Sequence, residues 1–174
     1  MRNIIRILEM AQKAGKEIAP GLCIKIENAG YLTLVIEHIG NAAPGGFPAI
    51  SVAHYGELNG DPMRDPEMCF HLEIDQWGRM RLFPYSFRND YVGVDRASKW
   101  EEDSEVFVHR GRYSDDLEFA LVWNRNIGDQ GFVAAYEKQL KGWLEGVCLC
   151  GAPMPNGVCS IPDCVCSSRQ KEGF

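Results

Sequence analysis

Five cysteines near the end of the chain are the residues best suited to chemistry. They all lie within residues 148–174, at Cys148, Cys150, Cys159, Cys164 and Cys166. Structural zinc sites are tetrahedral, and the protein usually offers their thiolates as two close pairs. Here the pairs are 148 with 150 and 164 with 166, each separated by one residue rather than the usual two. This cluster predicts a structural zinc site.

The spacing leaves the fourth ligand of such a site open. We expect Cys150, Cys159 and Cys164 to bind the metal, with either Cys148 or Cys166 completing the set. A reduced tail without metal and a redox pair of neighbouring thiols are the two alternatives. So short a segment has almost no core of its own and commonly folds around a metal, which favours zinc. An all-thiolate site leaves no position for water, so the zinc would be structural rather than catalytic.

A second group of chemically capable residues surrounds a histidine in the middle of the chain. His54 precedes a stretch that contains Asp61, Asp65 and Glu67. A histidine with nearby carboxylates can form an acid/base or metal site. Asn-Gly and Asp-Pro are also ordinary turn dipeptides, and a histidine at a strand end is usually solvated, so turn chemistry is the preferred interpretation.

Cys69 and His71 form a third candidate, as a nucleophile and its base. They share one face of an expected strand, opposite its apolar residues. Side chains two apart on a strand point in parallel and rarely converge on one atom, which argues against this pair. The sequence contains no phosphate loop, dinucleotide fingerprint, serine elbow or zinc-protease helix.

Acidic residues indicate a basic partner. Lys and Arg number 18 against 24 Asp and Glu, which gives a net charge of −6 and argues against a general nucleic-acid binder. Acidic residues gather in two segments, at residues 101–105 and 115–118. Such segments more commonly form a solvated face than a binding site. The candidate partner-binding residues are Glu101, Glu102, Asp103 and Glu105, together with Asn89, Asp90 and Tyr91, of which the asparagine and aspartate are also suited to capping local backbone groups.

Aromatic and arginine side chains alternate along residues 77–88, from Trp77 to Arg88. Exposed rings beside arginines can stack on bases. Half of them are expected to face the core because side chains alternate across a strand. This pattern supports a zinc-dependent nucleic-acid-binding regulator as the alternative function.

The chain is expected to have an α+β fold. Helical spacing of apolar residues predicts a helix over residues 3–16. From residue 22 the period changes to two and predicts an antiparallel meander of about five strands, near 22–26, 32–37, 50–58, 68–74 and 79–83. Residues 59–62 are expected to turn the chain and residues 65–66 to restart it. Residues 87–100 are expected to form an ordered loop, and residues 106–108 a short strand.

A long helix is expected after that strand, packed on the sheet and followed by a separate tail. Ser114, followed by two aspartates, predicts the helix N-cap. Gly128 and Gly131 interrupt the helical pattern, which indicates two helices or, as we prefer, one bent helix across the sheet. The composition changes at residue 146, so we expect an α+β domain over 1–145 and a zinc-binding appendage over 146–174. No apolar run could span a bilayer and no signal stretch opens the chain, which predicts a cytoplasmic protein.

Several stretches together resemble an uncharacterised bacterial domain family of unknown function. They read ENAGY at 27–31, LVIE at 34–37, PAISVAHY at 48–55, NGD at 59–61, DPEM at 65–68 and FRNDYVG at 87–93. The resemblance covers about residues 20–135. That family occurs in proteins of conjugative and phage-like mobile elements, and it brings no catalytic residues. The cysteine tail is not clearly part of the family pattern.

The resemblance implies an accessory protein of a mobile element. Small acidic proteins of this kind often inhibit host defence, as anti-restriction or anti-CRISPR proteins do. We therefore expect a non-enzymatic protein that binds a protein partner, with a nucleic-acid-handling effector as a fitting target. An enzyme that uses His54 and the loop from Asp61 to Glu67 is the third hypothesis.

Overall fold

The structure is a computed structural model and describes residues 1–144 of the 174-residue chain. The chain divides into two units, Met1–Val133 and a second that begins at Ala134, and each is described by itself. The predicted boundary near residue 146 and the cysteine segment that follows it lie outside the described residues. None of the described helices is long and apolar enough to cross a membrane.

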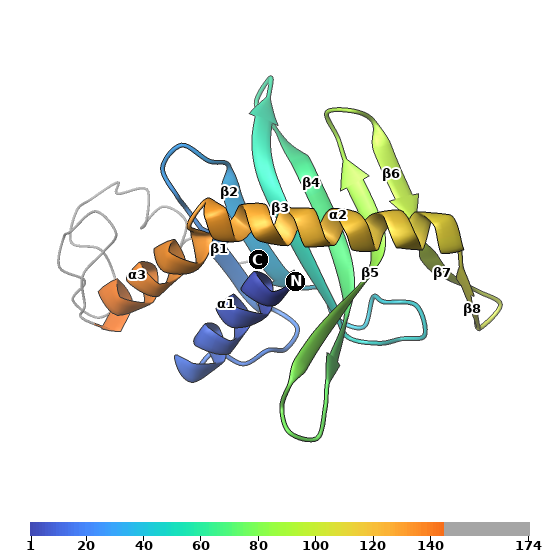
Figure 1. Ribbon diagram of the computed structural model, residues 1–174, viewed down its shortest axis with the longest axis horizontal. Helices are drawn as coiled ribbons and strands as arrows, with labels where there is room; N and C mark the ends of the chain where they lie inside the picture. Colours follow the sequence, from blue (N-terminus) through green and yellow to red (C-terminus); the bar gives the residue numbers. More distant parts are fainter. Residues whose placement is uncertain (145–174) are drawn as a thin grey trace. The chain divides into compact units, whose positions relative to one another are not determined.

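A six-stranded antiparallel sheet in sequence order forms the centre of the first unit (Figure 1). Its strands are β1 (Cys23–Ile26), β2 (Thr33–His38), β3 (Ala49–Leu58), β4 (Asp61–Ile74), β5 (Met80–Asn89) and β6 (Val94–Ala97). Each strand pairs with the next along the chain, which confirms the predicted meander. The sheet has one strand more than expected because residues 94–97, predicted as loop, pair with β5.

The turn between β3 and β4 is shorter than predicted. Asn59 and Gly60 have φ of 55° and 90° and form a two-residue connection, so β4 already begins at Asp61. Asn-Gly is favoured in such hairpin turns because both central residues need positive φ. The prediction of a turn over 59–62 was wrong for Asp61 and Pro62, which already lie in β4. This strand pairs with β3 in a register that shifts between Ala53 and Tyr55.

A separate two-stranded hairpin follows the main sheet. It consists of β7 (Lys99–Glu102) and β8 (Glu105–Val108), joined by Asp103 and Ser104 with φ of 51° and 65°. The sequence predicts only the second of these strands. The acidic run at residues 101–105 forms the end of β7, the turn and the first residue of β8.

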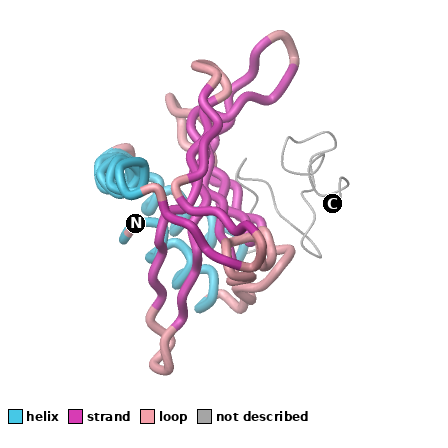
Figure 2. The backbone as a smooth tube through the Cα atoms, turned by 90° about the vertical axis from the view of Figure 1, so that its right-hand side faces the viewer, coloured by secondary structure: helices cyan, strands magenta, loops and turns pink. Residues whose placement is uncertain are grey.

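Two helices cover one face of the sheet, as Figure 1 shows from the front and Figure 2 from the side. These helices are α1 (Arg2–Lys13) and α2 (Arg110–Asp129). Ile4, Ile7 and Leu8 of α1 are fully buried, as are Ile36 and Phe70 of the sheet. The two-residue period of the strands therefore directs one row of apolar side chains toward the helices.

Helix α2 begins earlier than predicted. Its N-cap is His109, whose Nδ1 accepts a hydrogen bond from the Arg112 amide at 3.2 Å, whereas Ser114 lies inside the helix. His109 supplies the side-chain acceptor that a first helical turn requires. The strand β8 therefore leads directly into α2 without a loop.

The chain after residue 110 forms two helices rather than one bent helix. The second is α3 (Phe132–Leu144), and Gly131 between them has φ of 81°. Positive φ at this glycine ends α2, and the Asn28 side-chain amide donates a 2.6 Å hydrogen bond to the Gln130 carbonyl there. The preference for one bent helix was therefore wrong.

Gly128 brings α1 and α2 close together instead of breaking α2. A Cβ at this position would lie 2.5 Å from the amide nitrogen of the Asn3 side chain. The Asn3 amide donates to Asn124 Oδ1 at 2.8 Å, and the Asn3 side chain donates to the Asn124 carbonyl at 2.6 Å. These contacts fix the first turn of α1 against the C-terminal part of α2.

An ion pair joins α2 to the edge strand β6. Arg96 Nη2 lies 2.8 Å from Asp116 Oδ1, and Asp116 is completely buried whereas the Arg96 side chain is 28% exposed. Arg96 also lies 5.6 Å from the Phe87 ring centroid. A buried carboxylate requires such a partner because its removal from water is costly.

We predict that R96A lowers the free energy of unfolding by about 3 kcal/mol, because it leaves the Asp116 charge buried without a partner. Urea denaturation at neutral pH measures this loss. The matched control is R81A, which removes an arginine that is 62% exposed and pairs with Glu73 at 3.4 Å. The control is expected to change stability by less than about 1 kcal/mol, and equal losses in the two variants would contradict the assignment.

Candidate functional site

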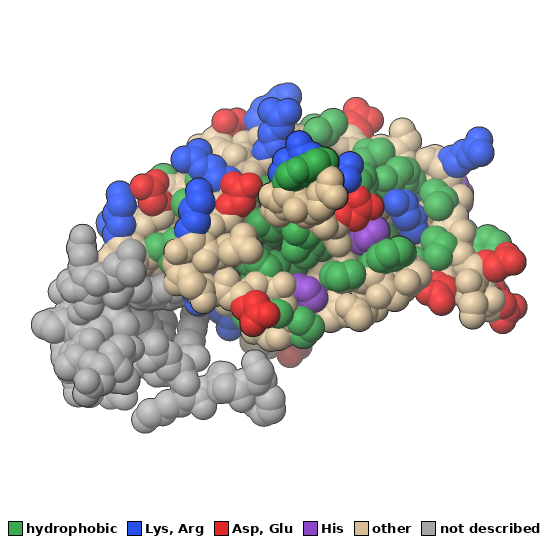
Figure 3. Space-filling view, turned by 90° about the horizontal axis from the view of Figure 1, so that it is seen from below, with side chains coloured by type: hydrophobic (Ala, Val, Ile, Leu, Met, Phe, Trp, Pro, Cys, Tyr) green, Lys and Arg blue, Asp and Glu red, His purple; other side chains and the backbone are tan. Residues whose placement is uncertain are grey.

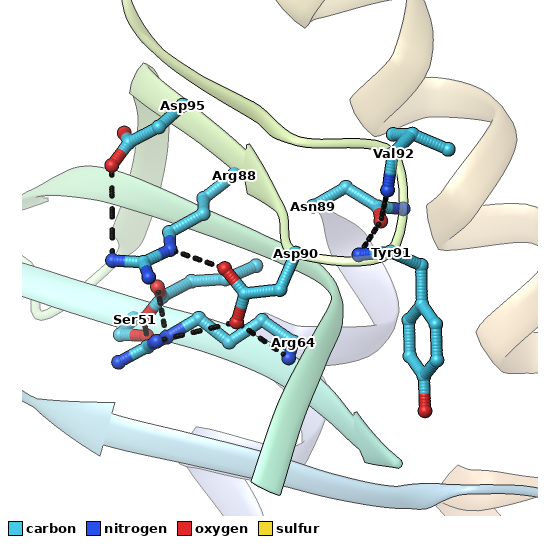
Figure 4. Close-up of polar contacts among 9 residues, drawn as sticks. Ser51, Arg64, Arg88, Asn89, Asp90, Tyr91, Val92 and Asp95 are labelled. Atoms are coloured by element: carbon cyan, nitrogen blue, oxygen red, sulfur yellow. Dashed lines mark hydrogen bonds and ion pairs between the residues drawn. The ribbon is translucent and has the colours of Figure 1, made fainter. Parts of the chain in front are cut away.

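A polar network occupies the face of the sheet opposite the helices, over β3, β4 and β5 (Figure 4). Its centre is Asp90, in the turn between β5 and β6. Asp90 Oδ2 accepts a 2.9 Å hydrogen bond from the Arg64 amide, and its Oδ1 lies 2.6 Å from Arg88 Nε. These contacts hold the pKa of the Asp90 carboxyl below its ordinary value, the Arg64 amide first and the Arg88 side chain second.

The network continues along β4 to β3. Arg64 Nε lies 2.8 Å from Glu67 Oε2, and Ser51 donates a 2.6 Å hydrogen bond to Glu67 Oε1. Arg88 also reaches Asp95 at 3.7 Å, where the aspartate is 73% exposed. Every charged group in this chain of contacts has an opposite charge beside it, so the network ties three strands together.

Asn89 and Tyr91, predicted with Asp90 as a partner-binding edge, also make contacts within the protein. Asn89 Oδ1 accepts hydrogen bonds from the Tyr91 and Val92 amides at 3.1 and 3.4 Å, and its Nδ2 donates to Asp65 at 2.8 Å. The Tyr91 hydroxyl donates to the Glu57 carbonyl at 3.3 Å. These side chains stabilise the β5–β6 turn, and their role toward a partner stays a prediction.

His54 belongs to the core on the helix-covered face. Its ring centroid lies 5.7 Å from that of Trp123 and 5.2 Å from that of Phe132, and its Nδ1 is 3.1 Å from the Leu32 carbonyl oxygen. Burial lowers the pKa of His54 below its ordinary value. Glu67 lies on the opposite face of the sheet, so the structure does not bring these two residues together.

Of the other members of that group, Asp61 lies away from His54, whereas the Asp65 carboxylate is near enough to raise the pKa of the His54 ring, against the larger lowering by burial. Asp61 is exposed and opens β4 directly after the hairpin turn. Asp65 accepts the hydrogen bond from Asn89 described above. The turn interpretation holds for Asn59 and Gly60, whereas the interpretation of His54 as a solvated residue was wrong because the side chain is 7% exposed.

Cys69 and His71 share the open face, as predicted, but have different neighbours. The His71 ring stacks on Phe47 with centroids 4.4 Å apart. Cys69 packs against the buried cluster of Ala43, Ala49 and Tyr85. Burial raises the pKa of the Cys69 thiol, which disfavours the thiolate that a nucleophile needs.

The acidic residues predicted to bind a partner gather on the β7–β8 hairpin. Figure 3 shows a group of acidic side chains on the right. Glu101 Oε2 accepts a 2.7 Å hydrogen bond from the Gly45 amide and so ties the hairpin to the loop over residues 40–48. Among the described residues, Glu102, Asp103 and Glu105 have no such contact and are exposed.

Apolar side chains accompany these carboxylates. Trp100 and Phe107 stack with ring centroids 5.8 Å apart, and they are 37% and 39% exposed. Val106 and Val108 are 49% and 45% exposed. A pocket of about 370 Å³ lies between the hairpin and the loop, and Tyr85, Lys99 and Trp100 belong to its lining. None of the apolar hairpin residues was predicted to bind a partner, although Val106, Phe107 and Val108 directly follow the acidic run at residues 101–105.

The alternating aromatic and arginine residues separate in the structure. Phe87 packs on Phe119 of α2, with ring centroids 5.0 Å apart. Trp77 is 70% exposed at the β4–β5 turn, and the Arg79 guanidinium lies 4.7 Å from its ring centroid. One exposed ring with one arginine remains from the pattern that suggested base stacking.

Within residues 1–144, no group of three or more His, Cys, Asp or Glu side chains is arranged to hold a metal ion. The predicted ligands Cys148, Cys150, Cys159, Cys164 and Cys166 lie outside the described residues. Of the two described cysteines, Cys23 lies on β1, where burial and Glu37 raise the pKa of its thiol to about 11.

Comparison with known proteins assigns the first unit to a family. A family model described as a domain of unknown function, DUF6908, matches residues 2–133, and the chain belongs to this family. The match begins earlier than the predicted resemblance and ends at nearly the same place. No curated protein and no solved structure matches the chain.

We predict that D90A lowers the free energy of unfolding by about 2 kcal/mol at neutral pH, because it removes charge-assisted hydrogen bonds from Arg64 and Arg88. The folded-state pKa of Asp90 is lowered, so its contribution is complete above the ordinary aspartate pKa of about 3.9. It is lost as the pH falls through the lowered value. Urea denaturation of the wild type and variant over a range of pH measures the difference.

The matched control is D95A, which removes a mostly exposed carboxylate from the same network. It is expected to change stability by less than about 0.5 kcal/mol. A D90A difference that stayed constant down to the lowest pH would show that the Asp90 charge does not stabilise the fold.

Proposed function

We propose that this protein is a non-enzymatic binding protein that engages a basic surface of a protein partner through the β7–β8 hairpin. One observation carries the proposal. Three carboxylates without a described partner, from Glu102, Asp103 and Glu105, lie on the same hairpin as four exposed apolar side chains. Exposed apolar patches rimmed by charge are typical of protein interaction sites.

The carboxylates would supply steering and orientation. Asp103 lies at the tip of the hairpin, with Glu102 and Glu105 on either side of the turn. Charges of one sign grouped at a protruding turn attract an oppositely charged surface and increase the rate of encounter. Glu101 has another role, because its bond to Gly45 holds the hairpin in place.

The apolar side chains would supply most of the affinity. Aromatic residues are enriched among the side chains that dominate binding energy at interfaces. Trp100 and Phe107 are already stacked on each other, so little side-chain freedom is lost when a partner covers them. The neighbouring pocket has room for a side chain of the partner.

A nucleic-acid-handling effector of host defence is the partner class that we propose. Such proteins bind nucleic acid through basic grooves, which an acidic hairpin complements. An anti-restriction or anti-CRISPR role in a mobile element follows from the setting implied by the sequence resemblance, and it remains part of this proposal. The alternative of an enzyme built on His54 has less support, because His54 packs among aromatic rings of the core.

We predict that the triple variant E102Q/D103N/E105Q binds the partner about tenfold more weakly, since three exposed charge pairs are lost. Asparagine at 103 keeps a residue that tolerates positive φ. The partner is first identified by mass spectrometry after affinity purification from host lysate, and its dissociation constant is then measured at several salt concentrations. The variant's affinity should also depend less on salt.

The matched control E9Q/E118Q/D129N removes the same number of charges from exposed positions on the helices. Its affinity should stay within about twofold of the wild type, because surface charges distant from an interface are largely screened. If both triple variants lost affinity equally, net charge rather than the hairpin would explain binding. If neither did, the proposed function would be wrong.

We further propose one structural zinc ion in the cysteine segment. Thiolate ligands suit zinc, and the five cysteines provide one more than a tetrahedral site needs. The zinc would order the segment that follows the described helices. It would not take part in catalysis.

Native mass spectrometry under reducing conditions should detect one zinc ion per chain, and a chelator should remove it. The triple variant C150S/C159S/C164S should carry none. The control C23S should keep the metal, because Cys23 lies on β1 with a raised thiol pKa. A metal-free wild type would refute the zinc site without affecting the proposed role of the hairpin.

A further inference from the structure

We propose that β8 binds an extended basic peptide segment of the partner as an added strand, a mode of recognition that rests on the proposed function of the hairpin. In this mode, backbone hydrogen bonds along a strand edge give affinity, and side chains on the two faces give selectivity. The juxtaposition that supports it is an unpaired strand edge beside three unpartnered carboxylates.

The register of the hairpin shows which backbone groups face outward. The His109 amide donates to the Ser98 carbonyl at 2.9 Å, so this pair is hydrogen-bonded. Such pairs alternate along an antiparallel ladder, which makes Trp100 with Phe107 the next hydrogen-bonded pair. The N–H and C=O groups of Val106 and Val108 therefore point away from β7.

No strand covers that outer edge among the described residues, where β7 and β8 form a two-stranded sheet. All four residues of β8 are exposed. The outer strands of the main sheet carry charged side chains within their span, Lys25 on β1 and Asp95 and Arg96 on β6. Such charges discourage pairing with another chain, whereas β8 continues from Glu105 into three apolar residues of high β propensity.

The negative charge of the hairpin favours a basic peptide as the strand that pairs with β8. A strand added beside β8 would place side chains next to Glu105 on one face and next to Val106 and Val108 on the other. A segment that alternates basic and apolar residues complements both faces.

The test uses the full chain and a fluorescein-labelled eight-residue peptide of alternating lysine and valine. Fluorescence anisotropy should show binding to the wild type. V106P removes an outward N–H and obstructs the approaching strand, yet it leaves the hydrogen bonds to β7 intact. It should weaken binding about tenfold or more, as expected for one or two lost backbone hydrogen bonds. The matched control V106T keeps the N–H and the β-branched shape and should bind within about twofold of the wild type.

A second peptide has the same sequence with every backbone nitrogen methylated, so that its charge is unchanged but neither edge can donate hydrogen bonds. It should not bind. Equal binding of the methylated peptide, or of V106P, would overturn strand addition and leave charge attraction alone. Self-association through β8, seen as a dimer in the wild type that V106P abolishes, would also overturn it.

Hydrogen exchange keeps the inference testable even if V106P fails to fold. In the wild type alone, the Val106 and Val108 amides should exchange faster than the Phe107 amide, and the unmethylated peptide should slow both valines. Unchanged exchange at saturating peptide would refute the proposed edge. If V106P still bound the natural partner while E102Q/D103N/E105Q did not, the proposed function would stand without strand addition.

Discussion

The two-residue period of the long strands is the constraint on which the rest of this structure depends. It directs apolar side chains of β2, β3 and β4 to one face, and that face requires cover by helices. Helices α1 and α2 provide it, and the contact of Asn3 with Asn124 joins them where Gly128 leaves space. The opposite face then receives the polar residues, including Ser51 and Glu67.

The polar face explains why a surface elsewhere is the better binding candidate. Asp90, Arg64 and Arg88 satisfy one another, so their charges hold the β5–β6 turn and are not available to a partner without cost. The hairpin differs because Glu102 and Asp103 have no described partner. Its carboxylates can meet an incoming positive charge without first breaking a contact.

The sequence was informative where periodicity was long and local. The first helix, five strands of the meander and the apolar face all follow from repeating patterns. Periodicity did not predict elements that depend on pairing with residues elsewhere in the sequence. Strand β6 has four residues, two of them charged, and only its pairing with β5 identifies it. The N-cap at His109 escaped because a serine with two aspartates nearby is the commoner start of a helix.

The acidic residues of the candidate site could be predicted from the sequence, whereas their arrangement on a hairpin could not. The acidic run at residues 101–105 was visible in the sequence, whereas its division by a two-residue turn depends on positive φ at Asp103 and Ser104. The bond from Gly45 to Glu101 joins residues 56 apart, and no local pattern shows it. The same limit applies to Asp90, since its partner Arg64 lies on another strand.

The contact between Asn3 and Asn124 also has a consequence for biosynthesis. These residues are 121 positions apart, so the apolar side of α1 has no α2 to pack against until nearly the whole first unit has left the ribosome. At about 5–20 residues per second, this interval lasts roughly 6–24 s. During that time Ile4, Ile7 and Leu8 form an exposed apolar stripe on the nascent chain, which chaperones that bind such stripes would meet before the domain closes.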